Sequence, residues 1–158
     1  MKNSKGSKLS DEYGTPQKLF DVYNEEFDFQ LDVCASNKNH KCDEFYTAKE
    51  DGLRSPWVKR NWCNPPYSKI LPWVNRAYEY THSGMTTVCL VKHDPSTRHG
   101  KLISQYADEL RIVENRIQFD GATLGANFPS AFAIFRPRLF TRKTDARILY
   151  VDYREVLK

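Results

Sequence analysis

Apolar residues recur along this chain with two periods, and the helical period is clearest in three segments. Thr15 is expected to be the N-cap of a first helix, with Pro16 at its first position, because both are standard start signals. The apolar stripe of this helix has spacings of three and four residues and consists of Leu19, Phe20, Tyr23 and Phe27. Ser68 is predicted to cap a second helix that ends near Gly84. A third helix is predicted around residues 100–107.

Between these helices the pattern is extended. Phe29, Leu31 and Val33 alternate with polar residues, which predicts a strand that ends in polar sequence after Ser36. Residues 86–92 form a continuous β-branched and apolar run, typical of a parallel strand that is buried on both faces. Further strands are predicted at residues 43–47, 60–63, 110–114, 116–119, 131–135 and 147–153.

The order of these elements predicts the fold class. Alternating strands and helices followed by a run of strands indicate an α/β fold, with a mostly parallel sheet, helices on both faces and antiparallel strands at one edge. Ligands of such sheets bind beyond the carboxyl ends of the strands, so the turns at residues 31–36, 50–52 and 64–67 are expected to face one crevice. We expect one domain over residues 11–158, without a separate target-recognition domain, after a flexible basic tail at residues 1–10.

Composition is that of a globular protein. The chain has 158 residues, 40% of them hydrophobic and 28% charged, which suffices for a core without cross-links. No apolar run approaches the roughly 20 residues of a membrane span, and the N-terminus lacks the apolar region of a secretory signal. We therefore expect a cytoplasmic protein without membrane contact.

The four cysteines are expected to be reduced, because none forms a Cys-x-x-Cys pair and a chain of this length needs no disulfide framework. Cys34, His40 and Cys42 lie close together in the sequence and are candidates for metal ligands. Their spacing matches no standard zinc motif, and the sequence offers no evident fourth ligand. Buried thiols without a metal are therefore the expectation.

Basic residues gather in two segments of this mildly basic chain, whose net charge is +4. The segments are residues 92–101 and 135–143, and both are predicted to include loops. Such stretches are usually solvated, but in a basic protein they favour a polyanionic partner such as nucleic acid. The residues predicted to contact nucleic acid are Lys69, Arg98, Lys101, Arg136, Arg138 and Arg142.

Residues 64–67, Asn-Pro-Pro-Tyr, form a stiff turn directly after a predicted strand. Pro65 and Pro66 fix two φ angles and remove two backbone donors. An exocyclic amino group on a purine or pyrimidine is a poor nucleophile, because its lone pair is delocalised into the ring. The Asn64 side chain and the Pro65 carbonyl can accept its hydrogens, and Tyr67 offers a face for a base extruded from a duplex. The turn therefore predicts activation of a base amino group by preorganised acceptors.

Taken in order, several segments resemble the N6-adenine DNA methyltransferases, specifically the small Dam-like enzymes of phages. They are YGTPQKLFD, FDFQLDVCAS, EDGL, CNPPYS, NRIQF and NFPSAFAIFRP, between about Asp11 and Pro137. The resemblance implies a Rossmann-like methyltransferase fold and transfer of a methyl group from S-adenosylmethionine to N6 of a flipped-out adenine in double-stranded DNA. S-adenosylhomocysteine would be the product. The implied catalytic residues are Asn64, Pro65, Pro66 and Tyr67.

The resemblance also implies where the cofactor binds. Residues 13–16 resemble the segment around the methionine end, and a helix N-terminus there suits a carboxylate. Asp32 matches the acid that pairs with the methionine ammonium, and Asp51 matches a later acid near the cofactor adenine. The usual glycine-rich loop is absent, but the small Ala35 in its place allows close approach. The predicted cofactor-binding residues are Tyr13, Thr15, Pro16, Asp32, Ala35 and Asp51.

Two other functions stay open on the sequence alone. Methylation of glutamine in protein or of adenine in RNA would need the same Asn-Pro-Pro-Tyr turn. A non-catalytic DNA-binding protein derived from this fold would explain the absent glycines, although the intact residues 64–67 oppose it. In the DNA methyltransferase interpretation, sequence specificity is expected from the loops at residues 92–101 and 120–129, and the oligomeric state is open.

Overall fold

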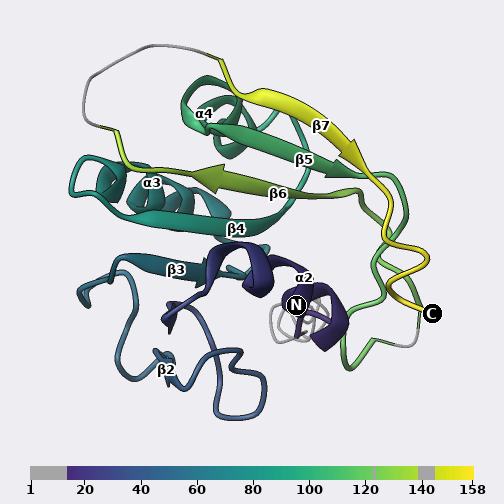
Figure 1. Ribbon diagram of the computed structural model, residues 1–158, viewed down its shortest axis with the longest axis horizontal. Helices are drawn as coiled ribbons and strands as arrows, with labels where there is room; N and C mark the ends of the chain where they lie inside the picture. Colours follow the sequence, from purple (N-terminus) through teal and green to yellow (C-terminus); the bar gives the residue numbers. More distant parts are fainter. Residues whose placement is uncertain (1–13, 123, 139–144) are drawn as a thin grey trace, which may run out of the picture.

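The computed structural model describes residues 14–122, 124–138 and 145–158, and its centre is a seven-stranded sheet (Figure 1). The strands lie side by side in the order β2-β1-β3-β4-β6-β5-β7. Their bounds are β1 Leu31–Asp32, β2 Glu44–Phe45, β3 Arg60–Cys63, β4 Thr86–Lys92, β5 Glu109–Val113, β6 Ser130–Phe135 and β7 Arg147–Val151. The helices labelled in Figure 1 are α2 Gln17–Phe27, α3 Ile70–Thr81 and α4 Arg98–Tyr106.

The sheet is mostly parallel. Strand β6 pairs antiparallel with both β4 and β5, and the other neighbouring pairs are parallel. The predicted α/β class and mostly parallel sheet are confirmed. The antiparallel pairs were expected at one edge, but they lie around β6, an inner strand, and the outermost pair β5–β7 is parallel. One edge of the sheet therefore collects the ends of β1, β3, β4, β5 and β7, on the right in Figure 1. We call the loops there the carboxyl edge, and the loops at the opposite ends of the strands the amino edge.

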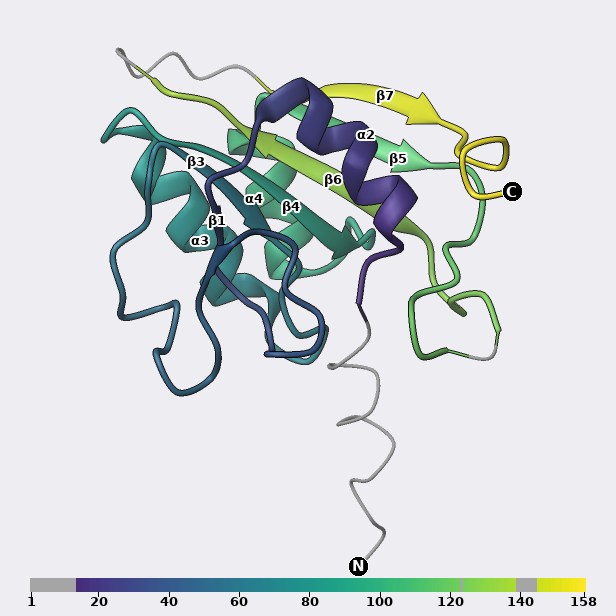
Figure 2. The same ribbon diagram turned by 60° about the horizontal axis from the view of Figure 1, so that its bottom comes forward.

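Helices cover both faces of the sheet, as predicted (Figure 2). Helix α2 packs on one face and α3 and α4 pack on the other. The α2 side of the core includes Leu19, Phe20, Tyr23, Phe27, Trp62, Val88 and Phe132. The α3–α4 side includes Ile70, Trp73, Val74, Cys63, Cys89 and Ile103. Alternate residues of β3 and β4 face opposite sides, and helices cover both sides, so the two strands are buried except at their ends. This explains the continuous apolar sequence of β4.

The start of α2 differs from the prediction. The N-cap position is Pro16, with φ −53°, and no side chain caps the helix. The prediction that Thr15 is the N-cap is therefore wrong. The Pro16 carbonyl accepts the N–H groups of Leu19 and Phe20 at 3.0 and 3.1 Å, which closes the first turn. The Thr15 hydroxyl is used elsewhere, by Asn64.

The other two helices begin after different signals. The N-cap of α3 is Lys69 rather than the predicted Ser68, and no side chain caps this helix either. In α4 the Thr97 hydroxyl accepts the Gly100 N–H at 3.1 Å, which is a regular cap. Within the described residues, no helix has the length and apolar character that crossing a membrane requires.

The predicted strand at residues 116–119 is a loop. Ile117 and Phe119 are buried on the α2 side of the core, which explains their strand-like alternation. The loop is held by other contacts: Ala126 N–H donates to the Ile117 carbonyl at 2.9 Å, and Asp120 forms an isolated β-bridge with Gly14. Burial, and not sheet pairing, therefore causes the alternation here.

Candidate active site

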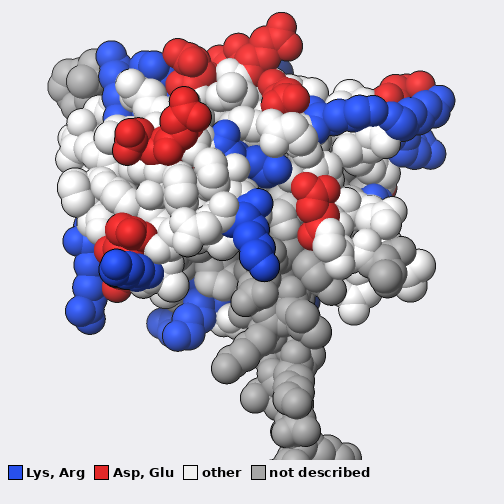
Figure 3. Space-filling view, turned by 90° about the horizontal axis from the view of Figure 1, so that it is seen from below, with Lys and Arg blue, Asp and Glu red and all other residues white. Residues whose placement is uncertain are grey.

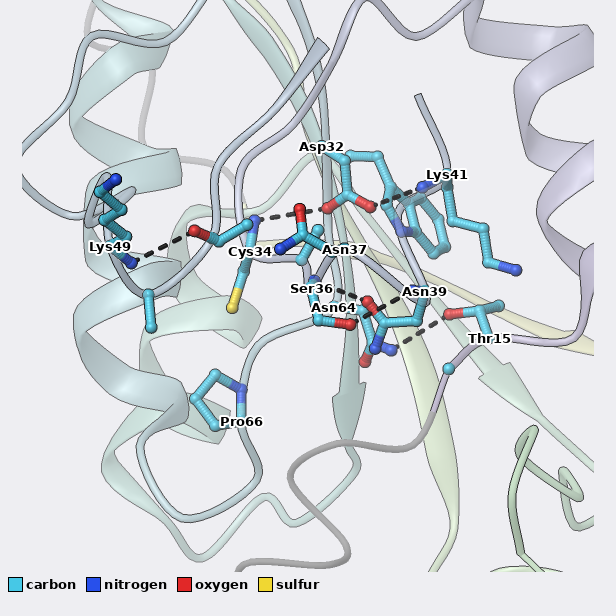
Figure 4. A pocket seen from close by; sticks show the side chains of 15 residues that line it. Thr15, Asp32, Cys34, Ser36, Asn37, Asn39, Lys41, Lys49, Asn64 and Pro66 are labelled. Carbon is cyan, nitrogen blue, oxygen red and sulfur yellow. Dashed lines mark hydrogen bonds between the residues drawn. The ribbon is translucent and has the colours of Figure 1, made fainter. Parts of the chain in front are cut away.

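A cavity of about 350 Å³ opens at the carboxyl edge, beyond the ends of β1 and β3 (Figure 4). Its walls are residues 14–15, the loop at 32–41, residues 47–49 and the turn that begins at Asn64. The crevice predicted from the strand order is therefore present. It brings the predicted residues Thr15, Asp32, Ala35, Asn64 and Pro66 together.

Asp32 ends strand β1 and is 2% exposed. Its Oδ1 accepts the Cys34 N–H at 3.3 Å and its Oδ2 accepts the Lys41 N–H at 3.0 Å. Burial raises the pKa of Asp32 to about 7, although these two N–H bonds lower it. The site therefore holds a buried carboxylate that gains from a cationic partner, because such a partner would offset the cost of burying its charge.

The loop after β1 has its shape without the usual glycines. Ser36 Oγ accepts the N–H groups of Lys38 and Asn39, and Asn39 Oδ1 accepts the Ser36 N–H at 2.8 Å. These side-chain bonds to the backbone define a compact turn that non-glycine residues can form. A glycine is required instead at Gly52, where the backbone passes close to the backbone of Val33 and a Cβ would lie 2.0 Å from the Val33 carbonyl oxygen. Sequence reasoning missed this role, although Gly52 directly follows Asp51.

A second recess of about 180 Å³ shares Cys34, Ala35 and Pro66 with the cavity. It is also lined by Asp51, whose φ is 55°. Asp51 Oδ1 accepts the Leu53 N–H at 3.2 Å, so the carboxylate helps to form the turn. The structure therefore places Asp51 beside the main cavity, and Pro16 at the start of α2, next to the wall formed by Thr15.

The Asn-Pro-Pro-Tyr turn follows β3 directly and meets the cavity through Asn64 and Pro66. Asn64 Nδ2 donates to Thr15 Oγ1 at 3.2 Å, and the Tyr67 hydroxyl lies 3.5 Å from Asn64 Oδ1. Pro65 is buried, whereas Asn64, Pro66 and Tyr67 are partly exposed. The four predicted catalytic residues are thus held in one turn, and two of them, Asn64 and Pro66, line the cavity.

Two phenylalanines support the ring of Tyr67. Phe119 and Phe128 contact it edge to face, with centroid distances of 5.7 and 5.0 Å. The Lys92 ammonium lies 5.6 Å from the centroid of the Phe128 ring. Sequence reasoning did not assign either phenylalanine to the site. The signal was present, because both belong to segments that carry the family resemblance.

The predicted nucleic-acid contacts divide between the two edges. Lys69, Arg98 and Lys101 are exposed and lie in the turn or helix that starts at the carboxyl edge. None of the three forms an ion pair with an acid of residues 14–122, 124–138 or 145–158. Figure 3 shows basic and acidic side chains interspersed over the face seen from below. That face therefore has no single continuous basic patch.

Arg136 and Arg138 lie at the amino edge, away from the cavity, and the structure does not bring them to the site. Arg136 pairs with Glu109 at 3.1 Å, and Arg138 pairs with Asp108 at 3.9 Å and donates to the Tyr106 carbonyl. These partners come from the end of α4 and the start of β5, which the local sequence could not reveal. Two other predicted residues, Tyr13 and Arg142, lie outside the described residues.

The cysteine and histidine group has other contacts. His40 Nδ1 bonds to the Cys42 carbonyl at 2.8 Å, and its ring stacks on Phe45 with a centroid distance of 4.0 Å. Cys42 is buried, and burial raises the pKa of its thiol to about 12. In the part of the chain that the structure describes, no group of three or more His, Cys, Asp or Glu side chains is arranged to hold a metal.

The fold is α/β, and an Asn-Pro-Pro-Tyr turn meets a cavity at the carboxyl edge of its sheet. The sequence predicted this arrangement for an amino-group methyltransferase. The comparisons identify the family. Residues 2–150 match the family model described as DNA N-6-adenine-methyltransferase (Dam). The chain belongs to this family.

Two curated relatives have the same description. The DNA N-6-adenine-methyltransferase of Haemophilus phage HP1 (strain HP1c1) is 32% identical over 151 residues, which cover 87% of each protein. The DNA N-6-adenine-methyltransferase of Escherichia phage T1 is 32% identical over 88 residues, which cover 54% of this chain and 37% of the phage protein. The similarity to the first relative therefore extends over most of both chains.

Proposed function

We propose that this protein transfers a methyl group from S-adenosylmethionine to the N6 amino group of an adenine extruded from double-stranded DNA. The observation that carries the proposal is that Asn64 and Pro66 of the Asn-Pro-Pro-Tyr turn line a cavity that is also lined by the buried Asp32. Family membership supports the same reaction and favours DNA over RNA or protein as the substrate. The site of action would be the cytoplasm of a bacterial cell.

The residues of the cavity fit the cofactor. A volume of about 350 Å³ with a neighbouring recess of about 180 Å³ lies in the range of small-molecule sites. Asp32 would bind the methionine ammonium, and the backbone beside Thr15 and Pro16 would lie near the carboxylate. Asp51, Ala35 and Pro66 line the recess, which is the proposed position of the adenine part. When bound, the cofactor supplies an electrophilic methyl group.

The chain's own residues would prepare the acceptor nitrogen. Asn64 Oδ1 and the Pro65 carbonyl would each accept a hydrogen of the adenine N6 amino group, which draws its lone pair out of the ring. The stiff diproline keeps both acceptors in place, so little reorganisation is needed at the moment of transfer. Tyr67, supported by Phe119 and Phe128, would hold the extruded base. The proton that the amino group loses would pass to solvent.

DNA would approach the carboxyl edge, because the acceptors lie there. Lys69, Arg98 and Lys101 are exposed at this edge and are the proposed phosphate contacts. Phe128, in the loop at residues 120–129, contacts the Tyr67 ring, and Lys92, at the start of the segment 92–101, lies over the Phe128 ring. We propose that these two loops read the bases around the target. Arg136 and Arg138 have less support as DNA contacts, because both are ion-paired at the opposite edge.

The test is incubation of the wild-type protein with methyl-labelled S-adenosylmethionine and an unmodified DNA duplex of mixed sequence. Parallel reactions contain total RNA or unfolded protein. Nucleoside and amino-acid analysis should find label in N6-methyladenine from DNA and background levels elsewhere. Label in RNA or in glutamine would identify the alternative substrate class. No transfer to any substrate, together with no binding of the cofactor in calorimetry, would indicate a non-catalytic member of the fold.

A further inference from the structure

One of the lysines that line the cavity is almost completely buried. The Lys41 side chain is 8% exposed, and its backbone N–H donates to Asp32 Oδ2 at 3.0 Å. In Figure 4 the side chain extends away from Asp32, toward the chain segment that carries Thr15. Lys41 therefore connects the neighbourhood of the buried carboxylate with the start of α2.

The Lys41 ammonium is held at that start. Its Nζ donates to Gln17 Oε1 at 3.1 Å, and Gln17 is the first residue of α2. Asp120 Oδ2 lies 3.9 Å from the same Nζ, and the backbone of Asp120 is bridged to Gly14. Gln17 and Asp120 thus place the ammonium beside Gly14 and Thr15, which form one wall of the cavity.

The contacts of this ammonium compensate its charge only in part. Gln17 is neutral, and the Asp120 carboxylate lies beyond hydrogen-bond distance, with 61% of its side chain exposed. A nearly buried ammonium gains from an anion that bonds to it directly, because burial otherwise disfavours the charge. The positive end of the α2 dipole favours an anion at the same place. Lys41 can therefore pair with an anionic group that is bound in the cavity.

The loop from Asp32 to Lys41 carries opposite charges at its two ends. Asp32 is 2% exposed and offers a carboxylate, and Lys41, nine residues later, offers an ammonium. The methionine part of S-adenosylmethionine has an ammonium and a carboxylate on one carbon atom. The two ends of the loop are therefore complementary in charge to the two groups of this zwitterion.

We propose that Lys41 binds the methionine carboxylate of S-adenosylmethionine, while Asp32 binds its ammonium. This inference rests on the proposed function, because that function supplies the cofactor. Sequence reasoning assigned the methionine end to residues 13–16 and Asp32, and Lys41 adds a charged side chain from a different segment. Lys41 takes no part in the transfer step, so its effect should be found in cofactor binding and should depend on the carboxylate.

The first experiment uses calorimetry to compare wild type with Lys41→Met, an apolar replacement of similar length. The ligands are S-adenosylmethionine and its decarboxylated form, which keeps the ammonium, sulfonium and adenosine groups. Wild type should bind the form with the carboxylate at least about tenfold more tightly, because the contact joins two charged groups. In Lys41→Met this preference should fall below about threefold, and the decarboxylated ligand should bind both proteins with similar affinity.

Three results would overturn the proposal. Wild type could bind the two ligands equally, which would mean that no group recognises the carboxylate. Lys41→Met could keep the wild-type preference, which would assign the carboxylate to other residues. Lys41→Met could instead lose affinity equally for both ligands, which would make Lys41 a structural residue of the cavity.

Asp120→Asn is the matched control. It removes the carboxylate beside Lys41 Nζ and leaves the backbone bridge to Gly14 in place. Affinity for S-adenosylmethionine should stay unchanged or rise by up to about threefold, because a competing anion is lost. A loss as large as that of Lys41→Met would show that the ion pair supports the cavity wall, and would overturn the proposal.

Thermal melting without ligand shows whether each variant folds. If Lys41→Met does not fold, Lys41→Gln replaces it with the same expectation. The wild-type titrations separate the two levels of inference. A wild type that binds neither ligand rejects the proposed function and the role of Lys41 with it. A wild type that binds S-adenosylmethionine, together with a Lys41→Met protein that keeps the preference for the carboxylate, rejects only the role of Lys41.

Discussion

At the amino edge of the sheet three arginines are paired with carboxylates, whereas three exposed cations at the carboxyl edge are not. The amino-edge pairs are Arg60–Asp28 at 3.1 Å, Arg136–Glu109 at 3.1 Å and Arg138–Asp108 at 3.9 Å. At the carboxyl edge, Lys69, Arg98 and Lys101 pair with no acid among the described residues. Similar residue types therefore have different surroundings at the two ends of the same strands.

We expect this difference to reflect different roles of the two edges. A paired and partly buried arginine holds elements together, and its charge is already neutralised by protein. An exposed lysine or arginine without a partner keeps its charge available for a phosphate and displaces counterions when it binds. The amino edge should thus affect stability, and the carboxyl edge should affect binding and chemistry.

The largest effect on stability is expected at the ion-pair cluster of Glu26, Glu109, Arg111 and Arg136. The Arg111 side chain is 14% exposed, binds both oxygens of Glu26 at 2.7 Å and lies over the rings of Tyr23 and Phe27. Arg111→Ala should lower the free energy of unfolding by on the order of 2 kcal/mol, because it removes the bidentate pair with Glu26 and the contact of the guanidinium with two buried rings. The loss is limited because Glu109 stays paired with Arg136. Urea denaturation measures this. Below the unfolding transition, methylation should continue at the wild-type rate.

Arg154→Ala is the matched control, since Arg154 pairs with Asp152 at an exposed position. Solvent screening should make this change nearly neutral. Equal losses of stability for Arg111→Ala and Arg154→Ala would contradict the contrast between shielded and exposed pairs.

At the carboxyl edge the largest effect on DNA capture is expected from Tyr67. Tyr67→Ala should weaken capture of the extruded base by about 1–3 kcal/mol, because a stacking surface is lost. The DNA concentration that gives the half-maximal single-turnover rate measures this. Tyr67→Phe is the control, because it keeps the ring between Phe119 and Phe128. If Tyr67→Ala and Tyr67→Phe behave alike, the ring does not stack on the base.

A paired charge experiment compares the two edges directly. Removing Arg98 and Lys101 together, by substitution with Ala, should reduce the slope of log affinity against log salt by about 2 if each contacts one phosphate. Removing Arg136 and Arg138 together should leave the slope unchanged and lower the melting temperature. A flattened slope for the second pair would restore the original sequence-based prediction for Arg136 and Arg138.

A smaller, graded effect concerns Asp32. Burial raises the pKa of its carboxyl group from a usual value near 3.8 to about 7. A raised pKa means that the folded protein without cofactor loses stability as pH rises between these values, because the carboxyl ionises in the unfolded chain while the buried one stays protonated. A cofactor ammonium needs the ionised form, so cofactor affinity should fall about tenfold per pH unit below 7. Calorimetry between pH 6 and 8 measures this, with Asp32→Asn as the control. Wild-type affinity that is flat over this range would remove Asp32 from the cofactor site.

The elements with strong periodicity could be predicted from the sequence. The stripe of Leu19, Phe20, Tyr23 and Phe27 is buried as expected, and residues 86–92 form β4 with the predicted bounds. These succeeded because burial of one face, or of both, sets the pattern of apolar residues locally. The alternation at residues 116–119 has the same cause, burial, but without a neighbouring strand, so the pattern alone could not separate the two cases.

The residues near the cavity could be predicted where adjacent residues are rigid, as in Asn64–Tyr67, or where an acid ends a strand, as Asp32 does. Contacts could not be predicted where the partner comes from distant sequence. The ion pairs of Arg136 and Arg138 are formed with residues 108 and 109, and the Thr15 hydroxyl meets an amide 49 residues away. Such contacts depend on the sheet order, which brings β5 beside β6 and the start of α2 beside the end of β3.

The central claim is that Asn64 activates an adenine amino group, and single-turnover methylation of duplex DNA by Asn64→Ala tests it most directly. The account predicts a rate about 10²–10³-fold below wild type, because one of two preorganised acceptors is lost. Cofactor affinity and thermal stability should stay close to wild type, since the diproline turn is unchanged. An Asn64→Ala protein that methylates adenine at the wild-type rate, or that does not fold, would show that the turn is structural and contradict the account.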